Sequence, residues 1–342
     1  MWPKEPISRA ARPARILCAP NPECVLGLGP MGAPHGRLHE TPSRALKSAL
    51  ARTLRHPLVN PALRLGLRPV AGLLPIELLQ RFPVVGTVRA PLAPGTVLQL
   101  DSGGRDQVAA AVYWRGLAGY EPETMAVYRR LLPGAGAVID VGASMGIFAL
   151  VAGLEDARRR VFAFEPVPET FACLERNLAL NARARVEPVA AAAAAFDGTI
   201  ELNVPAGESL PFGASTLPGH RDAGRRVTVR AVTLDRFVSE RAPGPVGVVK
   251  LDTEGTEPDV LAGARSLLAS DRPWIVCEVL HGMTEARLHE VLDPLGYRYF
   301  IIGRRGLTPR PRIDGDPSYR DRNWLFAPRE RADLEALCSL LA

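Results

Sequence analysis

The sequence predicts an α/β protein built on a doubly wound, mostly parallel β-sheet. Short apolar segments alternate with amphipathic segments between residues 138 and 327, and strands that alternate with helices form βαβ units. The chain has 342 residues, of which 47% are hydrophobic and 23% charged, the balance of a globular protein with one large or two smaller domains. Its longest apolar runs fall short of the roughly 18 residues that span a bilayer, so we expect no stable membrane insertion.

The first 80 residues differ in composition from the rest. They hold 11 Lys/Arg, 4 Asp/Glu and 12 of the 32 prolines, and proline at this density disfavours continuous helix or strand before about residue 40. A basic amphipathic helix is expected over residues 43–56. We interpret residues 1–80 as a basic Pro/Arg-rich N-terminal extension, partly disordered or helical. The domain that follows is expected over residues 81–342, with its core at 110–327.

The charge distribution and the N-terminus exclude several classes of protein. Residues 1–80 carry a net charge of +7 and the remainder −1, whereas a nucleic-acid enzyme places its basic surface on the folded domain. No apolar core of a secretory signal follows the first basic residues, so we expect a cytoplasmic protein without a nucleic-acid partner. The five cysteines are scattered and form no C-x-x-C pair, which argues against a disulfide framework or a zinc site.

Each element after residue 81 is predicted from its local pattern. Two short strands are expected at 87–90 and 97–100 around a Pro-Gly turn, and a helix at 122–132. The alternating region then contains strands at 138–141, 161–164, 189–195, 246–251, 274–279, 297–302 and 324–327. Helices are expected between them at 147–154, 169–180, 234–240, 260–269 and 285–292. Two further strands, 199–204 and 226–232, interrupt the alternation as a β-strand insertion around a Gly/Pro/Ser-rich stretch.

The most specific local pattern is the segment from Asp140 to Gly146, which follows a predicted strand and begins a helix. Its glycines allow close approach of a ligand to the backbone, and free N–H groups at the helix start can bind a carboxylate. The dinucleotide pattern G-x-G-x-x-G fails after Gly142. The spacing D-x-G-x-x-x-G suits S-adenosylmethionine instead, with Asp140, Gly142, Ala143, Ser144 and Gly146 as candidate binding residues.

A second pattern places an acidic residue at the end of the next strand. Glu165 and Pro166 follow the strand at 161–164, 25 residues after Asp140. A carboxylate in this position can accept hydrogen bonds from both ribose hydroxyls of a nucleoside. Ligands of open α/β sheets bind at the carboxyl ends of the strands, so Asp140 and Glu165 are expected at the same edge.

A third group of polar residues ends the strands at 246–251 and 274–279. Lys250 and Asp252 point to the same side because strand side chains alternate, so they are expected to form an ion pair. Asp252 is the first candidate for a general base, with Glu254 and His281 as alternatives, and Lys250 would hold Asp252 in place. Glu278 ends the second strand at the same edge. A structural Lys–Asp pair without catalytic work is the competing interpretation.

Taken together, these segments resemble the FkbM-type family of S-adenosylmethionine-dependent methyltransferases. The similarity covers most of residues 110–327 and includes Tyr120–Glu123, Val138–Gly146, Phe164–Pro168, Lys250–Gly255 and Asn323–Phe326. It implies a Rossmann-like class I methyltransferase sheet of seven strands, S-adenosyl-L-methionine as cofactor, and O-methylation of a hydroxyl on a sugar, glycan or secondary metabolite. The family usually has Asn at the position of Ser144, whose side chain has a shorter reach.

Alternative functions are a binding protein that keeps the sheet without catalysis, and a dinucleotide-dependent oxidoreductase. The intact Asp140, Glu165 and Asp252 argue against the first, and the failed dinucleotide pattern against the second. Oxygen ligands for Mg²⁺ could come from Asp252, Glu254 and Glu278, but no spacing demands a metal, so we predict none. The expected partner is a small-molecule or glycan acceptor, and the sequence leaves the oligomeric state open.

Overall fold

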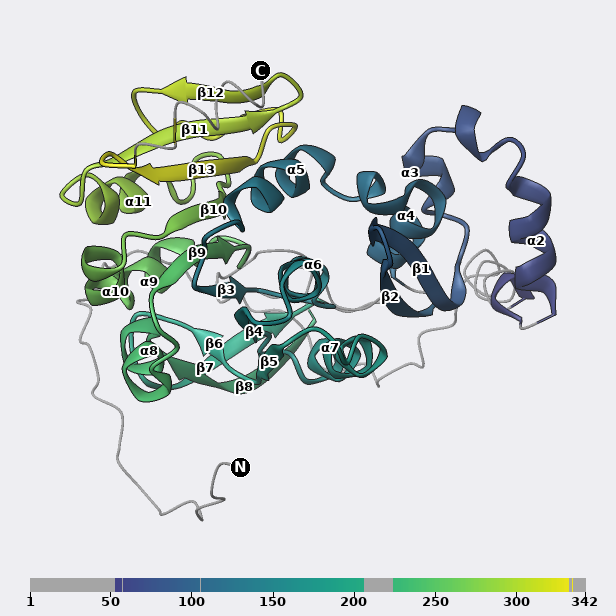
Figure 1. Cartoon of the computed structure of the whole chain (residues 1–342), viewed down its shortest axis with the longest axis horizontal. Coiled ribbons are helices and arrows are strands. Elements are labelled where there is room, and N and C mark those ends of the chain that lie inside the picture. Colours follow the sequence, from purple (N-terminus) through teal and green to yellow (C-terminus); the bar gives the residue numbers. More distant parts are fainter. Residues whose placement is uncertain (1–52, 57, 105, 206–223, 332–333, 335–342) are drawn as a thin grey trace, which may run out of the picture. The chain divides into compact units, whose positions relative to one another are not determined.

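The structure is a computed structural model, in which residues 53–56, 58–104, 106–205, 224–331 and 334 are described (Figure 1). The chain divides into two units, Met1–Ala45 and Leu46–Ala342, and all described residues belong to the second. Of the helix expected over residues 43–56, all but the last turn lies outside the described part, and that turn is helical. No helix of the described part is long and apolar enough to cross a lipid bilayer.

The main sheet is mixed but mostly parallel, as predicted. In the described residues it has eight strands, in the order β12-β11-β13-β10-β9-β3-β4-β5. Parallel pairing joins β10, β9, β3, β4 and β5, while β13 lies antiparallel to both β10 and β11. The strands are β3 Ala137–Val141, β4 Arg160–Phe164, β5 Val186–Val189, β9 Val246–Leu251, β10 Trp274–Glu278, β11 Tyr297–Gly303, β12 Gly306–Arg310 and β13 Asn323–Pro328.

The expected seven strands are thus joined by an eighth, β12, which sequence analysis missed. It pairs with β11 through a tight turn at residues 304–305 and forms the edge of the sheet. The strand contains Pro309 and is largely exposed, so it has neither the apolar alternation nor the composition of an inner strand. Proline is tolerated on an edge strand because an edge has backbone N–H groups with no partner strand.

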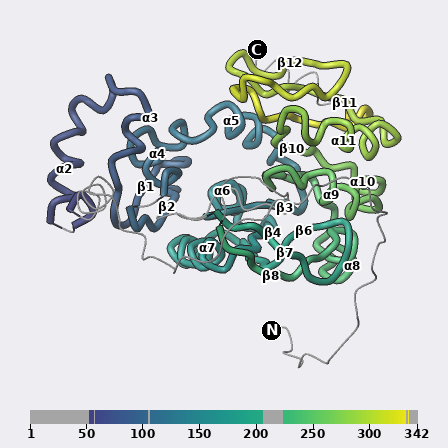
Figure 2. The backbone as a smooth tube through the Cα atoms, turned by 180° about the vertical axis from the view of Figure 1, so that it is seen from behind, coloured from purple at the N-terminus to yellow at the C-terminus, as the bar shows by residue number. Residues whose placement is uncertain are grey.

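Two helical layers cover the sheet, because each central strand presents alternate side chains to opposite faces. Val138 belongs to the core beneath the first layer and Ile139 to the core beneath the second. The first layer contains α4 Gln107–Arg115, α5 Pro122–Leu131, α6 Ile147–Glu155 and α7 Pro168–Leu180. The second contains α8 Leu234–Arg241, α9 Glu257–Ala262, α10 Arg265–Ser270 and α11 Glu285–Leu292, and in both views α9, α10 and α11 lie together near β10 (Figures 1 and 2).

Two predicted elements are divided in the structure. The expected helix over 260–269 is two short helices, α9 and α10, separated at Gly263. A Cβ added to Gly263 would lie 2.0 Å from the carbonyl oxygen of Ala194, so the close approach of another segment breaks the helix there. The expected strand over 189–195 is likewise split into the end of β5 and the short β6 Ala192–Ala193. The β-strand insertion then forms its own sheet of β6, β8 Arg225–Val232 and β7 Gly198–Val204.

The predicted hairpin is formed by β1 Val85–Ala93 and β2 Thr96–Gly103, and it is held to the domain by side-chain amides. The carboxamide oxygens of Asn177 in α7 and of Asn181, which caps the C-terminal end of α7, accept from the backbone N–H groups of Asp101 and Gln99 at 2.7 and 3.0 Å. Helix α4, which sequence analysis missed, begins at Asp106, whose carboxylate accepts from two N–H groups of its first turn.

The described end of the N-terminal extension packs on this hairpin. It contains α2 Val59–Leu67, a 3₁₀ turn at Ala71–Leu73 and α3 Ile76–Leu79. Outside the extension, a second 3₁₀ turn follows α4 at Gly116–Gly119. Asn60 is fully buried; its amide nitrogen donates to the carbonyl oxygens of Leu54 and Pro83, and its amide oxygen accepts from Val85 N–H. These bonds attach residues 54–60 to the start of β1.

Candidate active site

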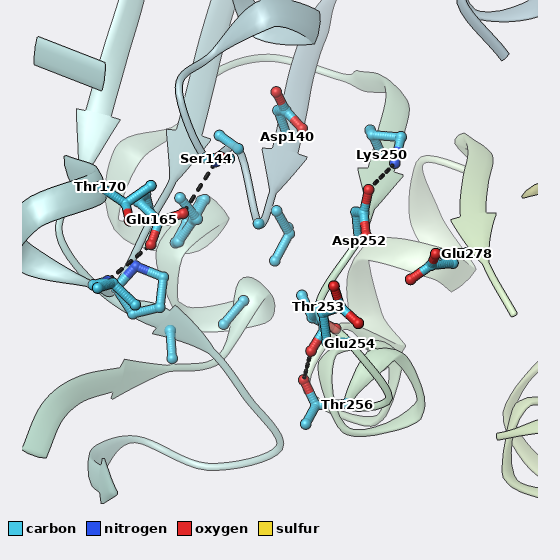
Figure 3. A pocket seen from close by; sticks show the side chains of 18 of the residues that line it. Asp140, Ser144, Glu165, Thr170, Lys250, Asp252, Thr253, Glu254, Thr256 and Glu278 are labelled. Carbon is cyan, nitrogen blue, oxygen red and sulfur yellow. Dashed lines mark hydrogen bonds and ion pairs between the residues drawn. The ribbon is translucent and has the colours of Figure 1, made fainter. Parts of the chain in front are cut away.

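A cavity of about 710 Å³ opens at the carboxyl ends of β3, β4, β9 and β10. Its lining contains all but one of the residues expected to bind the cofactor: Asp140, Gly142, Ala143, Ser144, Glu165 and Pro166. The residue that is absent from the lining is Gly146. Lys250, Asp252 and Glu254 line the same cavity. Figure 3 shows Glu165 and Ser144 on one side, Asp252 and Glu278 on the other, and Asp140 between them.

The two glycines of the loop after β3 are required by their surroundings. Gly142 has φ 76°, and a Cβ on it would lie 1.9 Å from the carbonyl oxygen of Asp252. Gly146 has φ 89°, and a Cβ there would lie 2.4 Å from a methyl carbon of Leu174. Glycine is the residue that adopts positive φ without a steric cost. The first glycine therefore brings the loop directly against the strand end that carries Asp252.

Asp140 also has a structural role at the start of α6. Its carboxylate accepts from the N–H of Ala149 at 3.0 Å, in the first turn of α6, so it satisfies a donor that a helix start leaves unpaired. Burial raises the pKa of Asp140 to about 7, although the nearby ammonium of Lys250 opposes that rise. Asp140 thus fixes the helix start while also facing the cavity.

Glu165 connects the strand β4 to the glycine loop. One of its oxygens accepts from Ser144 N–H at 3.0 Å and the other from Val167 N–H at 2.8 Å. Burial raises the pKa of Glu165 to about 7, while these two hydrogen bonds act in the opposite direction. Asp140 and Glu165 therefore line one cavity, as the sequence predicts, and both carboxyl groups sit where their charge is poorly solvated.

Three polar atoms in the cavity wall are buried without a hydrogen-bond partner among the described residues. They are the hydroxyl oxygens of Ser144 and Thr170 and one carboxylate oxygen of Glu278. Buried polar atoms of folded proteins are nearly always paired. Their gathering in one cavity indicates a polar ligand that completes the bonding. Ser144 also has φ 51°, a left-handed conformation that Asn tolerates better than Ser.

Lys250 and Asp252 form the ion pair that strand alternation predicts. The ammonium nitrogen lies 3.2 Å from a carboxylate oxygen of Asp252, and the side chains are 1% and 27% exposed. Burial alone would lower the pKa of Lys250, but the surrounding carboxylates, led by Asp252 and Glu121, outweigh it and raise that pKa. The ammonium also lies 5.0 Å from the ring centre of Phe148, within cation–π range. Lys250 is therefore held charged beneath the more accessible Asp252.

Two further charged residues reach the site from distant parts of the chain. Glu121, just before α5, accepts from the side chain of Asn323 at 3.1 Å, and burial raises its pKa. Arg322, just before β13, pairs with Glu278 at 2.7 Å. Burial and the charge of Asp252 raise the pKa of Glu278, against the effect of Arg322. Sequence analysis had named Glu121 only as part of the family resemblance and had not selected Arg322.

His281, the other alternative candidate for the base, lies outside the lining of the cavity. Its imidazole is 46% exposed and its Nδ1 lies 2.7 Å from the carbonyl oxygen of Gly315. The loop that carries His281 turns toward residue 315, where a glycine permits the approach. Glu254 does line the cavity, and the neighbouring loop is fixed by Glu257, which accepts from the N–H groups of Thr253 and Gly255.

The cavity is strongly acidic. Of the described lining residues, two are basic, Lys250 and Arg322, and seven are acidic: Glu121, Asp140, Glu165, Asp252, Glu254, Asp259 and Glu278. Within the described part of the chain, no group of three His, Cys, Asp or Glu side chains is arranged to hold a metal ion. Such a cavity attracts a positively charged organic ligand, since the wall supplies more negative than positive charge.

Comparisons with known proteins agree with the geometry. The model of the methyltransferase FkbM domain matches residues 140–299. The 31-O-demethyl-FK506 methyltransferase FkbM of Streptomyces tacrolimicus is 31% identical over 199 residues, which are 50% of this chain and 72% of that protein. The hexuronic acid methyltransferase AglP of Haloferax volcanii is 30% identical over 177 residues, 48% of this chain and 69% of the relative. The chain belongs to the FkbM methyltransferase family. A solved FkbM methyltransferase from Methylobacillus flagellatus KT is 17% identical, with 64% of this chain and 54% of that one aligned at a TM-score of 0.39.

FkbM-family enzymes depend on S-adenosylmethionine, and the cavity fits this cofactor. Its sulfonium is a cation that suits the acidic wall, and its methionine carboxylate suits the free N–H groups at the start of α6. The unpaired oxygens of Ser144 and Thr170 offer it hydrogen bonds. Glu165 at the end of β4 is placed to accept from ribose hydroxyls. The described residues thus offer partners for the sulfonium, the carboxylate and the ribose of the cofactor.

Proposed function

We propose that this methyltransferase O-methylates a hydroxyl group of a sugar, glycan or related small metabolite, with Asp252 as general base. The observation that carries the proposal is the Lys250–Asp252 pair, 3.2 Å long, in the cavity that Glu165 also lines. Two sequence relatives are named for 31-O-demethyl-FK506 and for a hexuronic acid, which supports an oxygen-rich small-molecule or sugar acceptor.

The division of work between the two residues follows from their exposure. Asp252 is accessible from the cavity, whereas Lys250 is enclosed behind it. An alcohol must lose its proton at or before methyl transfer, which calls for a positioned base. S-adenosylmethionine supplies a methyl group on a positively charged sulfur, an electrophile that needs no further activation. The remaining task of the protein is to align the acceptor oxygen and remove its proton, and Lys250 fixes the carboxylate for that task.

A discriminating experiment compares Asp252→Asn with Glu254→Gln, because both residues line the cavity and both changes preserve side-chain shape. Removing a general base lowers the rate by about 10² to 10⁴-fold. We expect a loss of this size in kcat for Asp252→Asn, with the affinity for S-adenosylmethionine within about threefold of wild type. Glu290→Gln, on the exposed side of α11, is the matched control and should behave like wild type.

The assay follows isotopically labelled methyl groups into a panel of hydroxylated glycans and metabolites, read as a mass gain of one methyl. A full loss in Glu254→Gln with normal turnover in Asp252→Asn would assign the base to Glu254. A protein that binds the donor and transfers no methyl group to any hydroxyl acceptor would be a binding protein instead. Stabilisation by NAD alone in a thermal-shift comparison would favour the oxidoreductase alternative.

A further inference from the structure

A second cavity of about 1000 Å³ adjoins the first and has the opposite charge. Six arginines line it, against three acidic residues, Glu121, Glu123 and Asp321. The arginines come from three separate segments: Arg115 from α4, Arg304, Arg305 and Arg310 from the β11–β12 hairpin, and Arg320 and Arg322 from the segment before β13. We call this cavity the arginine groove. Convergence from three segments distinguishes it from a chance run of basic residues.

Several of these arginines lack an internal partner. Arg115 is bonded to backbone oxygens of Gly72 and Leu74, and Arg322 to Glu278. Within the described part of the chain, the other four form no ion pair. They are exposed, and like charges gathered on one wall repel each other. An anion bound among them would relieve that repulsion and accept their hydrogen bonds, which suit carboxylate and phosphate groups.

The arginine groove shares part of its wall with the active site. Glu121 and Arg322 line both cavities. The side chain of Asn323 donates a hydrogen bond to Glu121, and Arg322 forms an ion pair with Glu278. A molecule in the groove thus contacts Glu121 and Arg322, which also line the cavity that holds Lys250 and Asp252. The acidic wall of the first cavity would repel an anion, so an acidic molecule needs a cationic surface at this place.

The lining also indicates what kind of anion fits. None of the described lining residues is aromatic, whereas proteins that bind single-stranded nucleic acid rely on aromatic stacking. Thr124, Thr308 and Asn323 supply neutral polar groups beside the arginines. This combination suits a hydroxylated molecule that carries discrete negative charges.

We propose, on the basis of the function proposed above, that the methyl acceptor is an acidic sugar or metabolite whose carboxylate or phosphate binds in the arginine groove. Arg304, Arg305, Arg310 and Arg320 hold the anionic group, while the hydroxyl to be methylated faces Asp252. These arginines are specificity-determining residues and take no part in moving protons.

The test measures binding by calorimetry to the full chain saturated with S-adenosylhomocysteine. The probes are methyl glucuronoside, glucose 6-phosphate, methyl glucoside and a short thymidine oligonucleotide. We expect the better of the two acidic sugars to bind at least about tenfold more tightly than methyl glucoside, and the pair of acidic sugars separates carboxylate from phosphate recognition. Equal affinity for all three sugars, or preference for the oligonucleotide over both acidic sugars, would overturn the proposal.

Variants locate the binding site. Arg304→Gln/Arg305→Gln should weaken binding of the acidic sugar about tenfold and leave the affinity for S-adenosylhomocysteine unchanged. Arg183→Gln/Arg185→Gln removes two exposed arginines that line neither cavity and should change nothing. Unchanged acidic-sugar binding in the groove variant would contradict the assignment. Methyl transfer to neutral sugars as fast as to acidic ones would contradict this inference and leave the proposed function intact. The absence of transfer to any acceptor would contradict the proposed function itself.

Discussion

The two cavities of this methyltransferase domain are adjacent but opposite in charge and in burial. In the first, seven carboxylates face two cations, and burial raises the pKa values of Glu121, Asp140, Glu165 and Glu278. In the second, six arginines face three carboxylates, and most of the arginines are exposed. The residues shared by both cavities are one acid and one base, Glu121 and Arg322. The contrast suggests that a cationic donor and an anionic acceptor are bound side by side and brought together at Asp252.

The largest loss of stability is expected from removing Lys250, the buried cation of the acidic cavity. Lys250→Met leaves Asp252, Glu121, Asp140 and Glu278 without their shared ammonium, and breaking a buried ion pair costs about 3–5 kcal/mol. Between pH 5 and 9 Lys250 is charged in both the folded and the unfolded chain. The pH dependence of the loss in unfolding free energy therefore comes from the carboxyl groups. The loss should be smaller at pH 5.5 than at pH 8, because protonation of these groups relieves their repulsion.

Urea unfolding at the two pH values measures this loss. The matched control is Arg287→Met, which removes an exposed ion pair with Asp259 and should cost less than about 1 kcal/mol. Equal costs for the two variants would mean that the acidic cavity does not depend on Lys250.

The acidic cavity also predicts a pH-dependent affinity for the donor. Glu165 has a pKa of about 7 in the free protein, so it loses its charge below neutrality. The dissociation constant for S-adenosylmethionine should therefore rise by about tenfold between pH 8 and pH 6. The affinity for the methyl glucuronoside should not follow this curve, because its carboxylate and the arginines stay charged throughout. Calorimetry over this range would refute the assignment if donor affinity were flat.

The raised pKa values of the buried acids also predict how the stability of the fold depends on pH. Asp140 and Glu165 ionise near pH 7 when folded but near pH 4 when unfolded. Between these values the unfolded chain binds fewer protons, so the free energy of unfolding should fall as the pH rises from about 4 to 7 and then level off. Asp140→Asn should reduce this fall, measured by thermal unfolding across the range. A stability that rises over this interval in wild type would contradict the burial of the two acids.

The smallest effect is expected at Ser144, which lies in the wall of the donor cavity. Asn adopts a positive φ more readily than Ser, and its longer side chain can reach a ligand. Ser144→Asn should raise the unfolding temperature slightly and strengthen donor binding by up to about fivefold, equivalent to about 1 kcal/mol. Ser144→Ala keeps the strain, removes the hydroxyl and should weaken binding. If both variants bind the donor equally, the side chain at residue 144 does not contact it.

Local pattern predicted much of the central sheet and of the donor cavity. Asp140, Glu165, Lys250 and Asp252 each end a strand of the parallel sheet, and the carboxyl ends of parallel strands meet at one edge, so their proximity follows from the alternation alone. Helices interrupted by tertiary contacts were harder to predict: the break at Gly263 depends on the backbone of residue 194, 69 residues away.

The rest of the site depends on contacts that no local pattern encodes. Glu121 meets Asn323 across 202 residues of sequence, and the arginine groove is assembled from α4, the β11–β12 hairpin and the segment before β13. The exposed edge strand β12 lacks the apolar pattern by which strands are recognised. The position of His281 was decided by where its loop turns, which depends on the close approach of Gly315.

Calorimetric titration of S-adenosylmethionine into wild type, Glu165→Gln and Arg304→Gln/Arg305→Gln tests the separation of the two cavities most directly. Glu165→Gln should weaken donor binding by at least about tenfold, because charge-assisted hydrogen bonds contribute about 1.5–3 kcal/mol, while the arginine variant should bind the donor like wild type. Unchanged donor affinity in Glu165→Gln, or an equal loss in both variants, would contradict the account.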